Sequence, residues 1–287
     1  MDKRLADRLG TGLLWAAMAL ILAILAWFLL HILGQGLPHL TPDFLFGLPS
    51  QISAGGGVGP FLFNSFYILT LSLVFSVPVG MGAGIWLAEY ARPGRFTDLI
   101  RLSTEALATV PSIVLGLFGM LIFVQWLGLG FTILGGALAL GLLNLPVLVN
   151  VTEAAIRSVP DSYREASLAL GATRFQTVTR VVLPAALPGL VTGITLVAGR
   201  ALGETAILVF TAGTTASRFF PDFDPLASGA TLAVHLWATG SNPIVPDADR
   251  IQAGAAALLV LMVLAFNLAV ALPARAWYRR RTGSLPS

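Results

Sequence analysis

The sequence predicts an all-α polytopic membrane protein with six transmembrane helices and both ends in the cytoplasm. Of its 287 residues, 56% are hydrophobic and 11% charged, with a mean hydropathy of +0.84, whereas soluble domains carry about 25% charged residues. Apolar runs of the roughly 20 residues needed to cross a bilayer recur along the chain. Basic residues gather in alternate connecting segments, which is typical of cytoplasmic loops.

The first apolar run, residues 12–34, follows Lys3, Arg4 and Arg8 as a signal peptide would. It runs for more than twenty residues and lacks a clear small-residue cleavage site, so we expect a retained helix. Gly128-Leu129-Gly130 separates two later runs and predicts a tight hairpin between them. The expected later helices are residues 63–89, 107–128, 131–153, 185–210 and 253–276.

These runs divide the chain into a cytoplasmic N-terminus, a first helix, an outer loop, a core and a basic tail. The core is expected to hold five membrane helices and a cytoplasmic loop at residues 158–184, with permease architecture as argued below. The five segments are residues 1–11, 12–34, 35–62, 63–276 and 277–287.

Charge placement predicts the orientation. All of the 17 lysines and arginines except Arg200, Arg218 and Arg250 fall on one side when the N-terminus is cytoplasmic. This positive-inside bias requires an even number of crossings. It also accounts for the net charge of +3, so nucleic-acid binding is not expected.

Several kinds of chemistry are excluded. The chain has no cysteine for disulfides or thiolate metal sites, and its three histidines have no metal-ligand spacing. Its only lysine is Lys3, so it has no phosphate-binding loop of the form G-x-x-x-x-G-K-[ST]. No catalytic residue, metal or cofactor is expected, and an enzyme or scaffold would leave the motifs below unexplained.

The loop at 158–184 is predicted to form two short helices. Ser162 and Glu165 have capping-box spacing. The first helix should run from Arg164 to Leu170 and end at Gly171, since glycine readily adopts the left-handed conformation. A second, from Arg174 to Leu183, should stop at Pro184.

This loop resembles the signature of ATP-binding-cassette (ABC) importer permeases. Glu165-Ala166-Ser167, Gly171 and Val181-Val182-Leu183-Pro184 follow the pattern Glu-Ala-Ala-x3-Gly-x9-Ile-x-Leu-Pro, with Ser167 and Val181 as departures. The resemblance implies a type I importer permease fold, in which a coupling helix enters a groove of a separate ATPase subunit. ATP is then hydrolysed by that partner. The alternative is that Glu165 only caps a helix and Gly171 only ends one. The coupling residues carried over are Glu165, Ala166, Gly171, Leu183 and Pro184.

Over roughly residues 55–275 the chain is most similar to PstA-type phosphate permeases. Four stretches carry this similarity: Asn64–Tyr67, Trp86–Ala91, Val110–Gly119 and Gly199–Ala206. The resemblance implies phosphate transport across the bacterial inner membrane. It also implies a PstC-type second permease, PstB-type ATPases and a PstS-type external phosphate-binding protein.

Arg200 is the candidate pathway residue. It lies 12 residues after Pro188, about 18 Å along a helix, where a charged residue costs about 2.5–3.5 kcal/mol on insertion scales. Glu204, four residues on, is expected on the same helical face as its partner. A guanidinium suits a tetrahedral oxyanion, although a structural ion pair would explain both residues. Asn150 stands where phosphate permeases often have an arginine. Either Arg157 or a partner subunit supplies the charge, or Asn150 is not part of the pathway.

Two other functions remain open. The chain could import another oxyanion, such as sulfate or molybdate. A secondary carrier driven by an ion gradient would instead predict inverted repeats or broken helices with polar sites near the midplane, and no repeat is evident.

Overall fold

A computed structural model describes the chain except for residues 1–2, 51–52, 218, 242, 244 and 283–287. The described residues form helices joined by loops, with one isolated β-bridge between Ala216 and Gly229. Wide π-helical turns extend α3 over Trp86–Tyr90, α5 over Met120–Trp126 and α8 over Val178–Val182. The α-helices are α1 (Lys3–Gly36), α2 (Pro42–Phe46), α3 (Gly59–Ile85), α4 (Arg95–Thr109), α5 (Ser112–Gly119), α6 (Ile133–Arg157), α7 (Asp161–Ala169), α8 (Arg174–Thr177), α9 (Leu183–Leu202), α10 (Ala206–Thr211), α11 (Leu232–Ser241) and α12 (Ala248–Thr282).

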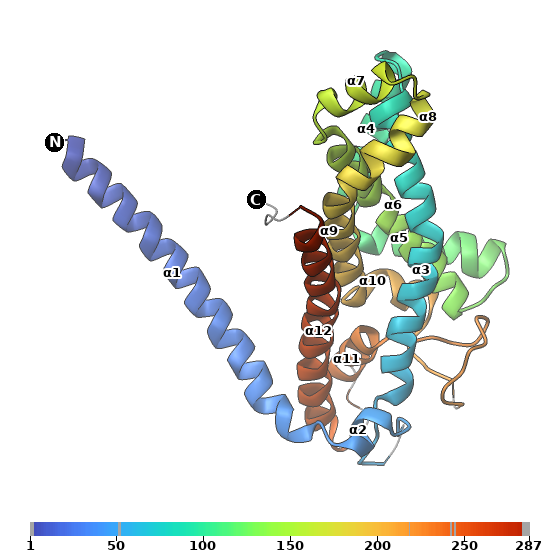
Figure 1. The fold of residues 1–287 in the computed structure, drawn as a ribbon. Helices are drawn as coiled ribbons and strands as arrows, with labels where there is room; N and C mark the ends of the chain where they lie inside the picture. The colour runs from blue at the N-terminus through green and yellow to red at the C-terminus, as the bar shows by residue number, and fades with distance from the viewer. Residues whose placement is uncertain (1–2, 51–52, 218, 242, 244, 283–287) are drawn as a thin grey trace.

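Within the described residues, five continuous helices are long and apolar enough to cross a membrane, and a sixth crossing is counted if α4 and α5 form one bent span. These helices contain the expected runs 12–34, 63–89 and 253–276, all but the first two residues of 131–153, and the first part of 185–210. Both the first turns of α1 and the last described turns of α12 point toward the end of the molecule that carries α7 and α8 (Figure 1). This arrangement agrees with the predicted common side for both ends and the loop.

The expected third span, 107–128, is not one straight helix. It breaks between Thr109 and Ser112, where α4 and α5 meet at 98°. Pro111 is the cause, because it lacks an N–H and pushes the preceding residue out of the helical region. Val110 is accordingly extended, at φ −64° and ψ 129°. The predicted turn that follows is confirmed, with Gly128 and Gly130 at φ +66° and +68°.

The fifth expected span, 185–210, is also interrupted. Helix α9 ends at Leu202, and the short α10 begins at Ala206. At its other end α9 is longer than expected, because the chain stays helical from Arg174 through Pro184 to Leu202. The predicted stop at Pro184 is therefore wrong. Proline is tolerated in the first turn of a helix, and Pro184 directly follows the wide turn at 178–182 and the start of α9.

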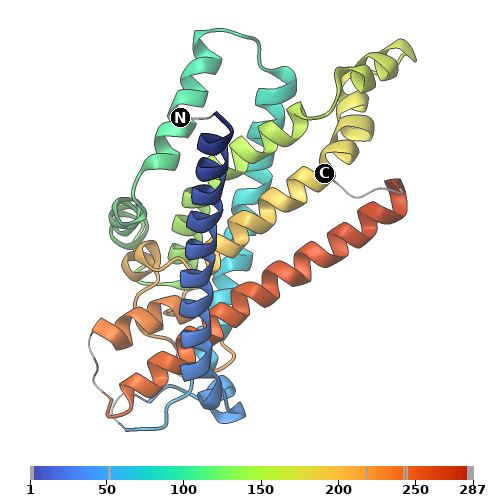
Figure 2. The ribbon, with the colours of Figure 1, turned by 90° about the vertical axis from the view of Figure 1, so that its left-hand side faces the viewer.

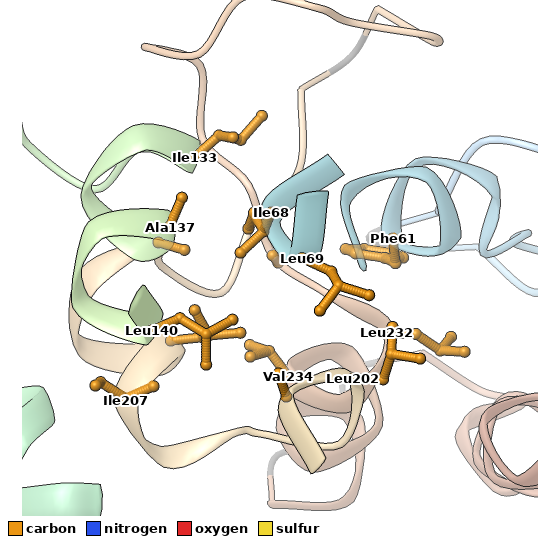
Figure 3. Close-up of a cluster of buried hydrophobic side chains, with 14 of the residues drawn as sticks. Phe61, Ile68, Leu69, Ile133, Ala137, Leu140, Leu202, Ile207, Leu232 and Val234 are labelled. Atoms are coloured by element: carbon orange, nitrogen blue, oxygen red, sulfur yellow. The ribbon is translucent and has the colours of Figure 1, made fainter. Parts of the chain in front are cut away.

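Small residues allow α3 and α6 to pack closely. A Cβ atom at Gly80 would lie 2.6 Å from Leu148 Cβ, and one at Gly84 would lie 2.6 Å from Thr152 Cβ. Membrane helices approach this closely where glycine replaces larger residues. The buried cluster beside this pair joins α3 and α6 to α9, α10 and α11, as the side chains of Ile68, Leu140, Leu202, Ile207 and Leu232 show (Figure 3).

Helix α1 diverges from this body (Figures 1 and 2). None of the most apolar 18-residue window of its span is buried. It meets α12 near its end, where Gly36 lies against Ala253 and Ala257. The rest of α1 therefore has lipid, or a subunit outside this chain, as its surroundings.

Candidate functional site

The loop between α6 and α9 folds into a compact protrusion, which we call the knob (residues 158–182). Helix α7 ends in a left-handed turn at Gly171, whose φ is +82°. The Gly171 N–H donates to Leu168 O at 3.0 Å and the Ala172 N–H donates to Ser167 O at 3.2 Å. This pair of bonds is the Schellman motif that ends many helices. The predicted helix end at Gly171 is confirmed.

The start of α7 differs from the prediction. The helix begins at Asp161 with Pro160 as its N-cap, and no side chain caps it. Ser162 thus lies inside the helix, so the expected capping box between Ser162 and Glu165 is wrong. A capping box forms instead at the start of α8, between Thr173 and Gln176.

The knob presents an exposed apolar tip. Leu170 is 88% exposed and Phe175 is 70% exposed, while Glu165, Ala166 and Gly171 are also exposed on the knob. Inside the knob, the hydroxyls of Ser167 and Thr177 lie 2.9 Å apart, and this hydrogen bond joins α7 to α8.

The structure does not bring all five coupling candidates together. Leu183 and Pro184 lie in the first turn of α9, beyond the knob. Leu183 packs with the buried cluster that contains Ile156 and Val182. These two residues therefore belong to the base from which the knob projects, whereas Glu165, Ala166 and Gly171 belong to the part that a partner can touch.

Sequence reasoning missed the residue that anchors the knob. Arg164 donates from Nε and Nη2 to Glu89 Oε1, at 2.9 and 2.7 Å. Glu89 belongs to the wide turn that ends α3. The sequence shows both charged residues, but 75 residues separate them. Rules based on local spacing do not predict a contact between residues so far apart.

A second ion cluster lies between α4 and α6. Glu153 Oε1 accepts from Arg101 at 2.9 Å and from Arg157 at 3.0 Å. One carboxylate thus meets two guanidinium groups, which leaves the cluster with one net positive charge. Asn150 lies one turn earlier on α6 and is exposed. Arg157, expected as a source of positive charge near Asn150, is therefore part of an ion cluster.

Arg200 lies where α9 ends. Within the described residues its side chain forms no salt bridge, and neither does that of Glu204. The expectation that the two share a helical face is wrong, because the helix stops at Leu202 and the Glu204 N–H bonds back to Ala201 O at 3.2 Å. The four-residue spacing relates side chains only within a continuous helix.

One face of α9 near Arg200 is buried and the other is exposed. Val197, Ala198, Ala201 and Leu202 are buried, whereas Thr192, Leu196 and Arg200 lie on the exposed face of α9. In Figure 1, α9 ends about half-way between the knob and the opposite end of the molecule. A charged group at such a depth faces protein or water rather than lipid. Irregular backbone within a membrane is likewise tolerated only where it is buried or lines a watery cavity.

Comparison with known proteins identifies the architecture. Residues 80–282 match the family described as "Binding-protein-dependent transport system inner membrane component". The chain belongs to this family. It is thus the permease subunit of an ABC importer and a multi-pass protein of the inner membrane, as the knob and the apolar helices predicted.

Curated relatives cover nearly the whole permease. A probable ABC transporter permease protein, YqgI, of Bacillus subtilis is 46% identical and aligns over 94% of this chain and 95% of its own length. The phosphate transport system permease protein PstA 1 of Mycobacterium tuberculosis (strain H37Rv) is 33% identical, over 98% and 91%. PstA of Haemophilus influenzae is 32% identical, over 91% of each chain. The resemblance to PstA-type permeases is confirmed.

Solved structures confirm the type I importer fold. The permease resembles a chain of the inward-facing MetNI methionine ABC transporter, with a TM-score of 0.59 and 22% identity over 74% of this chain and 94% of that one. It also resembles a chain of a bacterial ABC transporter that imports alginate, with a TM-score of 0.61 and 17% identity over 98% and 100%. Broken helices, which a secondary carrier would also predict, thus occur in this ABC permease, at 109–112 and 202–206.

Proposed function

We propose that this permease carries inorganic phosphate through the membrane, as the PstA-type subunit of an ATP-driven importer. The observation that carries the proposal is the exposed guanidinium of Arg200 at a break in a membrane helix. Its planar fork of donors matches two oxygens of a tetrahedral anion. The relatives named PstA support phosphate as that anion.

Arg200, Glu204 and Asn150 form the proposed pathway set. Arg200 would attract the anion, and the half-buried Glu204 would keep that attraction weak enough for release. The exposed amide of Asn150 can donate two hydrogen bonds but carries no charge. Because Glu153 already pairs with Arg157, a partner subunit would supply the positive field there.

The substrate is tested by reconstituting the permease with a PstC-type permease, PstB-type ATPases and a PstS-type binding protein in vesicles. We expect uptake of labelled phosphate that requires ATP and is not reduced by excess sulfate or molybdate. If sulfate or molybdate reduces phosphate uptake even at the same concentration as phosphate, the permease belongs to a broader oxyanion importer. Uptake by the permease without the ATPase would contradict the proposal and favour a secondary carrier.

The knob is the proposed docking site for the ATPase. Its exposed Leu170 and Phe175 provide apolar contacts of the kind that a groove buries. The sequence contains no cysteine, so single cysteines can be introduced without removing any. A cysteine at Leu170 should crosslink to a cysteine in the groove of the ATPase. A cysteine at Leu226, which is 56% exposed in the outer segment, is the matched control and should not. Equal crosslinking at both positions would contradict this orientation.

A further inference from the structure

Arg164 joins the knob to two membrane helices at once. Besides its two bonds to Glu89, its Nη2 donates to Ile156 O at 2.9 Å and its Nη1 donates to Val159 O at 2.6 Å. Ile156 belongs to the last turn of α6, whose carbonyl oxygens have no partner within the helix. Asp161, in the first turn of α7, is 3.2 Å from Nη1. One guanidinium thus connects the end of α3, the end of α6 and the start of α7.

Burial makes this link specific. The Glu89 side chain is 7% exposed and that of Arg164 is 18% exposed, whereas Arg157 in the other ion cluster is 54% exposed. Both guanidinium donors meet the same oxygen, Glu89 Oε1, and hydrogen bonds between ionised groups are stronger than neutral ones. Breaking such a pair leaves a charge with little access to water, which is strongly unfavourable. Helix α7 therefore has one favoured position relative to α3.

The linked helices lead to the proposed pathway. Helix α3 packs against α6 at Gly80 and Gly84. Helix α6 packs in turn against α9, where Gly193 lies against Val151 and Gly189 against Ala155. Arg200 lies at the far end of that helix. Closely packed elements of this kind move as units rather than deform continuously.

We infer that the Arg164–Glu89 pair passes movement of α7 to α3 and α6, so that an event at the knob changes the surroundings of Arg200. Arg164 is a positioning residue in this role, and Glu89 is its acceptor on the membrane side. The inference rests on the proposed docking of the ATPase at the knob but does not require phosphate to be the substrate. Neither residue belongs to the coupling or pathway sets described above.

The test uses the reconstituted complex and compares Arg164→Ala with Arg101→Ala. The control breaks a similar forked pair, with Arg101 Nε and Nη2 at 3.1 and 2.9 Å from Glu153, but that pair does not touch the knob. Arg164→Ala should lower substrate taken up per ATP hydrolysed about tenfold, within the range of site-to-site couplings. Arg101→Ala should leave that ratio unchanged. Co-purification with the ATPase checks assembly.

A second readout does not depend on the substrate. A cysteine at Thr192, on the same exposed face as Arg200, is labelled with a water-soluble thiol reagent with and without a non-hydrolysable ATP analogue. The analogue should change the labelling rate in the parent and in Arg101→Ala, but not in Arg164→Ala or Glu89→Ala. If Arg164→Ala does not assemble, Arg164→Lys, which keeps the charge without the fork, should show a reduced response.

These measurements separate the two proposals. An unchanged uptake ratio or an unchanged labelling response in the Arg164 variants would overturn the inference, as would a parent complex whose labelling ignores the nucleotide. A parent that responds to nucleotide but takes up no phosphate would contradict the proposed substrate, while the loss of that response in Arg164→Ala would still support the link. Glu89→Ala and the double variant should be no worse than Arg164→Ala, because removing either partner removes the same contact.

Discussion

Replacing Arg200 with alanine should reduce ATP-driven phosphate uptake by about 10- to 100-fold, since hydrogen bonds to charged groups contribute about 1.5–3 kcal/mol. The side chain is exposed and, within the described part of the chain, forms no ion pair. Its removal should therefore leave the fold and the assembly intact. Uptake of labelled phosphate in vesicles, with co-purification of all subunits, measures the effect.

The matched controls are Arg200→Lys and Arg250→Ala. Lysine keeps the charge but replaces the planar fork with a single ammonium group, so uptake should be intermediate. Arg250 is an exposed arginine at the start of α12, and its removal should change uptake little. Undiminished uptake by Arg200→Ala in an assembled complex would refute a transport role for this residue.

Replacing Gly171 with valine should largely abolish transport by disturbing the knob. A left-handed backbone costs an ordinary L-residue about 1–2 kcal/mol, and β-branched residues fit it least well. At about 2 kcal/mol the native turn becomes roughly thirtyfold less favoured. No atom would lie within 4 Å of a Cβ at Gly171, so the effect arises from the backbone and not from a clash. ATP-driven uptake and binding of the ATPase are measured together.

Gly82→Val and Gly82→Ala are the controls for this experiment. Gly82 lies within α3, and a Cβ there would also meet no atom within 4 Å. Because its backbone is helical, alanine should be neutral or slightly stabilising there. Gly171→Asn should retain more activity than Gly171→Val, since asparagine tolerates the left-handed region better. Full activity of Gly171→Val would show that the turn is not needed for coupling.

The sequence was sufficient for the features that depend on local composition and charge. The apolar runs predicted helices at 12–34, 63–89, 131–153 and 253–276, which lie within helices of the structure except for residues 131–132. The left-handed turn at Gly171 was also predicted from local sequence, since its φ of +82° suits glycine better than any other residue.

Interruptions within apolar runs were the main source of error. The predicted spans 107–128 and 185–210 run through Pro111 and Gly203, yet the helix ends beside each of these residues. Both residues signal a possible break, but proline at Pro78 and Pro146 leaves α3 and α6 continuous. Packing against neighbouring helices decides whether a helix breaks or continues at such a residue, and local sequence does not specify that packing. The Arg164–Glu89 contact was missed for the same reason, because it joins distant segments.

Because Arg101 and Arg157 share the carboxylate of Glu153, substitutions at the three positions should have unequal effects. Loss of either Arg101 or Arg157 leaves an acid that still has one basic neighbour. Loss of the acid instead leaves two like charges facing each other at the junction of α4 and α6, which repel. Redundancy thus protects the arginines but not the glutamate, so conservative replacement by glutamine should harm this permease more than removal of either basic partner.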